Sequence, residues 1–233
     1  MQRLLVRPKS LTDLALDSIR QLIVGGELAM GAQLSEATLA AQLGISKTPV
    51  REALLRLRVD GLIEIQPQRG TFVFSLTPRQ VEEICAFREV VELSAVKLAM
   101  ESRGPELARA LHANVREMAP ARRAGDWKSV RQLDEAFHRA IVDHCDNACL
   151  QQAHELIASK IAALRARLRE QDEQVEHCQQ NHAEIVALLR EGRVAATQRA
   201  LALHIRETLE AYRAASNVAE PADAGLAARV GSR

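Results

Sequence analysis

Four side chains in the second half of the sequence carry atoms that bind divalent metals. Asp134 and His138 lie four residues apart, which places them on one face of a helix. His182 lies ten residues before Gly192 and His204 twelve after it, so an antiparallel helix pair turning at Gly192 would bring both histidines to nearly the same height. One carboxylate and three neutral imidazoles suit zinc or a similar metal, with positions left open for a ligand. Taken singly, each histidine is better explained as a hydrogen-bonded core or boundary residue.

A second group of polar side chains follows the turn at Gly44. Lys47 and Thr48 lie in the first turn of the helix expected after Ser46, and Arg51 lies one turn further on. A helix presented by its N-terminus can place such side chains on base edges in a DNA major groove, while its N–H groups favour phosphates. Arg51 is the expected base reader, because its planar guanidinium can bond guanine O6 and N7 together.

The elements that must position these donors follow the order of a winged helix-turn-helix. Helices are expected over 11–24, from the cap Ser35 to 43, and from Ser46 onward, followed by two strands about a turn at 67–70. The third helix has an apolar stripe of Val50, Ala53, Leu54 and Leu57. Arg69 lies at the tip of this hairpin, from which it could enter a minor groove. Each cation alone would be better explained as an ordinary solvated surface charge. The turn, cap, apolar stripe and hairpin together favour DNA binding.

Two segments of this region resemble the DNA-binding domain of the GntR family. They are LGISKTPVREALLRL and GLIEIQPQRGTFV, and the resemblance extends over residues 10–75. Some members of the family carry an arginine where this chain has Ala37, so a DNA contact from that position is absent here. The resemblance implies that the residues contacting DNA are Lys47, Thr48, Arg51, Gln68, Arg69 and Gly70.

From residue 77 onward the pattern is almost wholly helical. Thr77 is a suitable N-cap, Pro78 suits the first helical position, and Gln80 is placed for a capping box. Helices that bury apolar stripes against one another form a bundle, and six fit here: 78–101, 105–123, 126–144, 148–171, 174–190 and 194–214. The expected fold is mostly α, with a winged helix-turn-helix domain at 1–76, an all-α six-helix bundle at 77–216 and a disordered tail at 217–233.

The bundle region, residues 77–215, resembles the FCD effector domain of the FadR-type branch of the GntR family. The segments that carry the resemblance are LDEAFHRAI, NHAEI and ALALHI. Asn181 stands where the second motif usually has a glutamate, which leaves the neighbouring histidine intact. The resemblance implies a divalent metal ion, with zinc favoured over nickel or manganese, bound by Asp134, His138, His182 and His204.

Arg88 places a guanidinium on an otherwise apolar helix stripe. A buried cation needs an anionic partner, and Glu92 one turn on could supply it. The FCD resemblance suggests the alternative, in which Arg88 binds the carboxylate of a small organic acid that also reaches the metal. Asn147 could line the same effector pocket, although a role as a helix cap is favoured.

Composition limits the classes of protein to which the chain can belong. The 233 residues are 47% hydrophobic and 26% charged, which is typical of globular proteins, and the length favours two domains. Short apolar runs and the lack of an apolar leader predict a soluble, cytoplasmic protein with no membrane partner. The net charge of +1 gives no global signal for nucleic acid, so DNA binding must depend on local charge.

The combined pattern predicts a homodimeric transcription regulator that binds double-stranded operator DNA and responds to a small organic acid. Repression that the acid releases is the expected direction. A regulator with a purely structural metal site is the alternative. A metalloenzyme is less favoured, because the chain has no helical His-Glu-x-x-His motif and no second carboxylate in the donor set to act as a general base.

Overall fold

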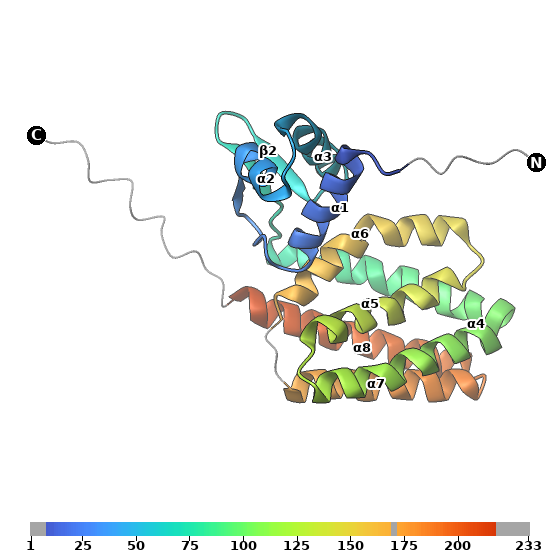
Figure 1. The fold of residues 1–233 in the computed structure, drawn as a ribbon. Coiled ribbons are helices and arrows are strands. Elements are labelled where there is room, and N and C mark those ends of the chain that lie inside the picture. Colours follow the sequence, from blue (N-terminus) through green and yellow to red (C-terminus); the bar gives the residue numbers. More distant parts are fainter. Residues whose placement is uncertain (1–7, 169–171, 218–233) are drawn as a thin grey trace, which may run out of the picture.

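The computed structural model describes residues 8–168 and 172–217, which form an N-terminal winged region and a helical bundle (Figure 1). The predicted tail at 217–233 lies outside the described residues except for Asn217, which ends the last helix. Among the described residues no helix is long and apolar enough to cross a membrane. The elements of the winged region are α1 (Leu11–Val24), β1 (Gln33–Leu34), α2 (Glu36–Leu43), α3 (Lys47–Val59), β2 (Ile63–Gln66) and β3 (Gly70–Val73).

Local sequence signals fix the ends of the helices in the winged region. The Ser35 side chain accepts a hydrogen bond from the Thr38 N–H and caps α2. Gly44 ends α2 in the left-handed conformation, with φ of 66°, which turns the chain toward α3. The α3 stripe of Val50, Ala53, Leu54 and Leu57 is buried as predicted. This burial turns the opposite face of α3, including Lys47 and Arg51, toward solvent.

The wing is a three-stranded antiparallel sheet with the order β1-β3-β2. Strands β2 and β3 form the predicted hairpin, in which Glu64 pairs with Phe72. Strand β1 was not predicted, because its two residues are too few to show an alternating pattern. In the hairpin turn, Gln68 has a φ of 60° and Gly70 a φ of 118°.

Five long helices form the bundle: α4 (Pro78–Arg123), α5 (Trp127–Asp143), α6 (Ala148–Ala166), α7 (Asp172–Arg190) and α8 (Val194–Asn217). Thr77 and Gln80 form the predicted capping box of α4. The helices expected at 78–101 and 105–123 are joined in α4, which has non-helical backbone angles at Arg103. The predicted break is therefore a kink, because Pro105 removes one backbone donor and crowds the preceding turn without forcing a loop.

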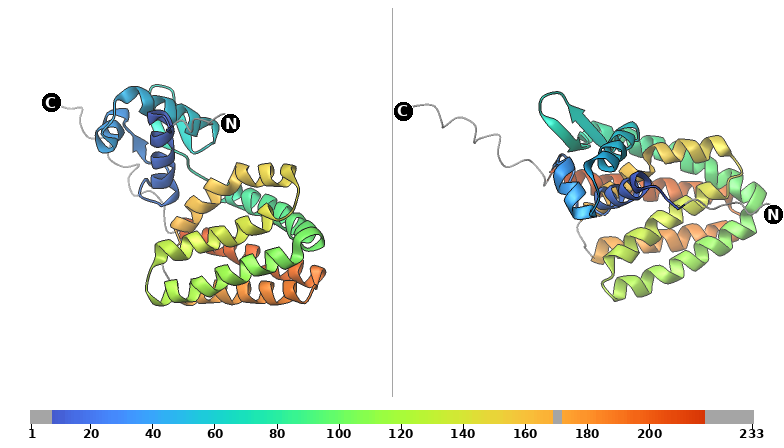
Figure 2. Two further views of the ribbon diagram at one scale, coloured as in Figure 1. Left: turned by 45° about the vertical axis from the view of Figure 1, so that its right-hand side comes forward. Right: turned by 45° about the horizontal axis from the view of Figure 1, so that its top comes forward.

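Helix α6 lies against the winged region, as Figures 1 and 2 show. Ala163 on α6 is 2% exposed and belongs to the hydrophobic core of the winged region. Ile157, Ile161 and Leu164 of the same helix pack in a second cluster with Val81 and Tyr212 of the bundle. The helix α6 thus contributes to both cores.

Candidate metal centre and nucleic-acid interface

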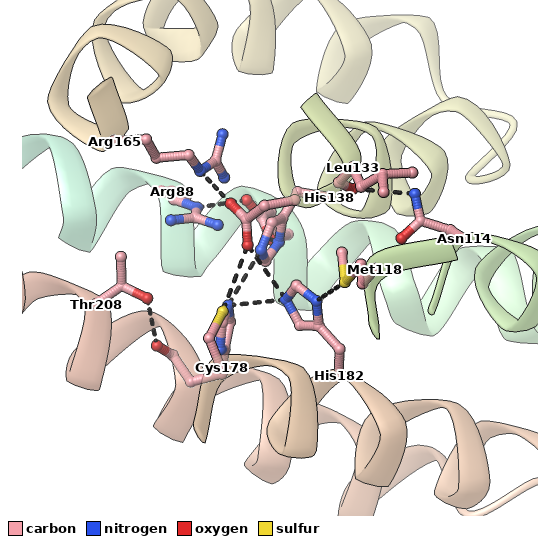
Figure 3. Close-up of polar contacts among 12 residues, drawn as sticks. Arg88, Asn114, Met118, Leu133, His138, Arg165, Cys178, His182 and Thr208 are labelled. Atoms are coloured by element: carbon pink, nitrogen blue, oxygen red, sulfur yellow. Dashed lines mark hydrogen bonds and ion pairs between the residues drawn. The ribbon is translucent and has the colours of Figure 1, made fainter. Parts of the chain in front are cut away.

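Three helices bring the four predicted metal ligands together inside the bundle. Asp134 and His138 come from α5, His182 from α7 and His204 from α8, and their ligand atoms all lie within 4.8 Å of one another. The Nε2 atom of His204 lies 3.1 Å from Nε2 of His138 and 3.2 Å from Nε2 of His182. Figure 3 shows His138 and His182 directed toward this shared space.

Burial keeps the three imidazoles neutral. The exposed fractions are 1% for His138, 0% for His182 and 2% for His204. Burial lowers the pKa of His182 to about 4 and lowers the pKa values of His138 and His204 well below the ordinary histidine value. Neutral imidazoles keep the lone pair that a metal requires.

Glu92 on α4 orients one of these histidines. Its Oε2 lies 2.7 Å from Nδ1 of His138, which leaves Nε2 directed into the cluster. A carboxylate on the far ring nitrogen is the usual support of a histidine that binds a metal. A partial signal for Glu92 is present in the sequence, because it follows Arg88 by one helical turn, but nothing there shows that His138 lies next to it.

The donor set fits a divalent metal. Nitrogens that bind one zinc ion at about 2.0–2.1 Å in a tetrahedral arrangement are separated by roughly 3.3 Å. The two Nε2 separations in the cluster, 3.1 and 3.2 Å, are close to that spacing. Asp134 Oδ1 lies 3.5 Å from Nε2 of His182 and adds a carboxylate oxygen to the three nitrogens.

Asp134 is held in place by Arg165 of α6, which forms an ion pair with its Oδ2. Burial alone would raise the pKa of Asp134, but the positive charge of Arg165 outweighs it and holds that pKa well below its usual range. The Cys178 thiol donates to the other oxygen, Oδ1, at 3.5 Å. Sequence reasoning missed Arg165, because several arginines surround it and nothing in that pattern marks one of them as buried.

Arg88 and Glu92 form a buried ion pair, which is the first of the two alternatives predicted for Arg88. The Arg88 Nε donates to Glu92 Oε1 at 2.6 Å, and the two side chains are 1% and 0% exposed. Burial disfavours the charge of Arg88, but the Glu92 carboxylate outweighs it and raises the pKa of Arg88 above its ordinary value. Within the described residues, the two terminal nitrogens of Arg88 have no hydrogen-bond partner.

A cavity of about 160 Å³ lies beside the cluster. Asp134, His204 and Arg165 line it, together with the polar side chains of Asn181, Glu207 and Thr208. The two residues predicted to bind the effector, Arg88 and Asn147, are not among the described residues that line this cavity. The Asn147 side chain instead accepts hydrogen bonds from the N–H groups of Cys149 and Leu150 at the start of α6.

The six residues predicted to contact DNA are all exposed. Lys47, Thr48 and Arg51 lie in the first two turns of α3, and the other three lie at the wing turn. Arg51 bonds Glu36 of α2, with Nε 3.0 Å from Oε1 and Nη2 2.7 Å from Oε2. Sequence reasoning missed this partner, whose only visible signal was its place in the first turn of α2.

Known proteins resemble the chain in both regions. Residues 11–73 match the model of bacterial regulatory proteins of the gntR family, and residues 83–207 match the FCD domain, which alone spans more than half of the chain. A probable D-xylose utilization operon transcriptional repressor of Paenarthrobacter nicotinovorans is 30% identical over 195 residues, covering 84% of this chain and 85% of that protein.

Two further proteins extend this similarity. An uncharacterized HTH-type transcriptional regulator in an unstable DNA locus of Streptomyces ambofaciens is 37% identical over 124 residues, 53% of this chain and 52% of that protein. The solved structure of E. coli McbR/YncC has a TM-score of 0.79 and 26% identity, covering 90% of this chain and all of that one. The protein therefore belongs to the GntR family of bacterial DNA-binding transcription regulators, in the group that carries an FCD domain.

Proposed function

We propose that the protein is a homodimeric repressor that contains a divalent metal and leaves its operator when a small organic acid binds beside that metal. The DNA contacts come from Lys47, Thr48 and Arg51 of α3 and from the wing tip, where Gln68, Arg69 and Gly70 are exposed. The names of related proteins support repression, since one of these relatives is a probable operon repressor.

The net charge of the buried groups is the main observation in favour of an acid as the effector. Arg88 and Arg165 are matched by Glu92 and Asp134, and the three histidines are neutral. A divalent metal would therefore leave two uncompensated positive charges among these buried groups. Because a buried charge is costly without an opposite partner, the site favours an anionic ligand over a neutral one such as a sugar.

The ligands of the metal would be Asp134, His138, His182 and His204. Zinc is favoured for the mixed nitrogen and oxygen donor set, with nickel and manganese as alternatives. When bound, the metal supplies a Lewis-acid site for a carboxylate oxygen. Arg165, which lines the cavity, can pair with the same acid, and the terminal nitrogens of Arg88 offer further donors near Glu92. Asn147 is better explained as the cap of α6.

An exposed apolar surface on α4 and α8 supports the homodimer. Phe87 and Val90 of α4 are 38% and 67% exposed, and Leu203 of α8 is 55% exposed. The ion pair of Arg206 with Glu89 holds the two helices together beside these residues. A second copy covering this surface would place two winged regions on one palindromic operator.

A thermal-shift screen of the zinc-loaded protein against small mono-, di- and tricarboxylic acids tests the proposal. A bound acid raises the melting temperature by mass action, and neutral sugars of similar size serve as the control. The acid that binds must also lower affinity for operator fragments selected from random DNA. Stabilisation by zinc with no response to any acid would instead support a purely structural metal. Equal responses to acids and sugars would contradict the charge argument.

A further inference from the structure

The last turns of α6 touch the metal centre and the winged region at the same time. Arg165 pairs with Asp134, while Ala163 is buried in the core of the winged region. A Cβ added at Gly26, in the loop after α1, would lie 3.3 Å from the Cβ of Ala166. The backbone of that loop therefore packs directly against α6, with small residues on both sides.

Two longer side chains extend this contact. Arg167 Nη1 lies 3.1 Å from the Met30 sulfur in the loop that follows α1. Lys160, further back along α6, lies beside Gly61, where an added Cβ would meet its Nζ at 3.1 Å. The contact therefore continues from Lys160 to the end of α6 and on to Arg167, which follows the helix.

Asp134 connects this helix to the metal ligands. Its Oδ1 lies 3.5 Å from Nε2 of His182, whereas its Oδ2 forms the ion pair with Arg165. A metal that attracts Oδ1 acts on a carboxylate whose other oxygen is bound to α6. Where small residues pack closely, as Gly26 does against Ala166, the interface transmits such displacements, because the contact is close to the backbone on both sides.

We propose that Arg165 is the positioning residue through which occupancy of the metal centre changes the seating of the winged region on the bundle. This inference rests on the proposed function, because it requires a metal at Asp134 and the three histidines. It adds a second connection to the direct one, in which α4 follows the wing at Thr77. An acid in the cavity would act on the same connection, since its carboxylate and that of Asp134 compete for one guanidinium.

Hydrogen exchange of the full chain, without metal and with zinc alone, tests this connection. In the parent protein, zinc should slow amide exchange at 25–31 in the winged region as well as around the ligands. Arg165→Met should bind zinc, as elemental analysis would show, but lose the slowing at 25–31. Arg165→Lys keeps the positive charge on a shorter side chain, so this variant should lose part of the slowing at 25–31. Gln152→Ala, at an exposed position of α6, is the matched control and should behave like the parent.

A variant at Arg167, the residue that follows α6, removes a different contact with the winged region and shows whether misfolding explains the effect of the Arg165 variants. Arg167→Leu leaves the Asp134 pair intact and removes the contact with Met30, so it should bind zinc like the parent but show weaker slowing at 25–31. If the parent binds zinc but exchange at 25–31 does not change, or if Arg165→Met responds like the parent, the proposed connection is wrong while the metal site stands. If the parent binds no zinc, the proposed metal site is itself wrong.

Discussion

Arg51 is the single residue on which sequence-specific DNA binding is expected to depend most. Its guanidinium is already held by Glu36, which fixes the planar group at the N-terminal end of α3. Arg51→Ala should weaken operator binding by about 1–3 kcal/mol and relax the preference at one base position of each half-site. Arg58→Ala, at an exposed position near the end of the same helix, is the control. Binding measured on single-base operator variants would contradict the assignment if Arg51→Ala were as selective as the parent.

A substitution at another single residue, His182, tests the proposed metal centre. The purified protein should hold ~1 divalent ion per chain, as a site with four protein ligands implies. His182→Ala should lose much of this metal, because the variant lacks one of three clustered imidazoles. His177→Ala is the matched control, since His177 lies on the same helix, α7, and pairs with Glu207 outside the donor set. Elemental analysis after reconstitution decides the matter, and full retention of the metal by His182→Ala would rule out the site.

The neutral histidines also predict how the metal-free protein responds to acid. The folded pKa of His182 is about 4, below the value of ~6.5 expected in an unfolded chain. Between these two values the unfolded state binds more protons, so the free energy of unfolding should fall as the pH drops from about 6.5 toward 4. One such histidine accounts for a loss on the order of 3 kcal/mol down to pH 4, of which about 2 kcal/mol falls above pH 5. Urea unfolding of chelator-treated protein at about pH 7.5, 6 and 5 measures it, with His182→Ala expected to show a smaller loss.

At the scale of the element, the features that could be predicted are those encoded over a few residues. The Ser35 cap, the turn at Gly44 and the capping box at Thr77 depend on neighbours in the sequence, and all three were predicted. Strand β1 depends on pairing with β3, nearly forty residues later, and its own sequence carries no pattern. The pairing of Arg165 with Asp134 likewise depends on how α6 packs against α5, which periodicity alone does not determine.

Two glycines provide a matched test of these local rules. Gly44 has a φ of 66°, whereas Gly104 lies inside α4 without a positive φ, and within the described residues an added Cβ would meet nothing within 4 Å at either site. Gly44→Ala should destabilise the protein by about 1 kcal/mol, since an alanine resists the left-handed conformation. Gly104→Ala should be neutral or stabilise by roughly 0.4–1 kcal/mol through the unfolded chain. Equal effects in urea unfolding would contradict this account.

At the scale of the whole molecule, the clustering of the four candidate metal ligands could be predicted but their surroundings could not. Helical spacing and the turn at Gly192 sufficed to bring His182 toward His204, because both lie on one antiparallel pair. The contact of α6 with the winged region joins parts of the chain more than a hundred residues apart. In the proposed mechanism, this contact and the start of α4 are the two routes by which a ligand in the bundle would affect the predicted DNA-binding residues.

The proposed coupling between acid and operator is a property that only the intact molecule can show. A coupling free energy of about 1–3 kcal/mol would change operator affinity by about 5- to 150-fold, enough to switch a promoter.

If the acid reaches Arg88, the double variant Arg88→Met with Glu92→Gln should keep its metal and its operator binding but lose this response. The paired change avoids an isolated buried charge, and the amide oxygen that replaces the Glu92 carboxylate can still accept a hydrogen bond from His138. Operator titrations with and without the screened acid measure the effect. A double variant that responds like the parent would show that Arg88 serves only as the partner of Glu92, leaving Arg165 as the cation that meets the acid.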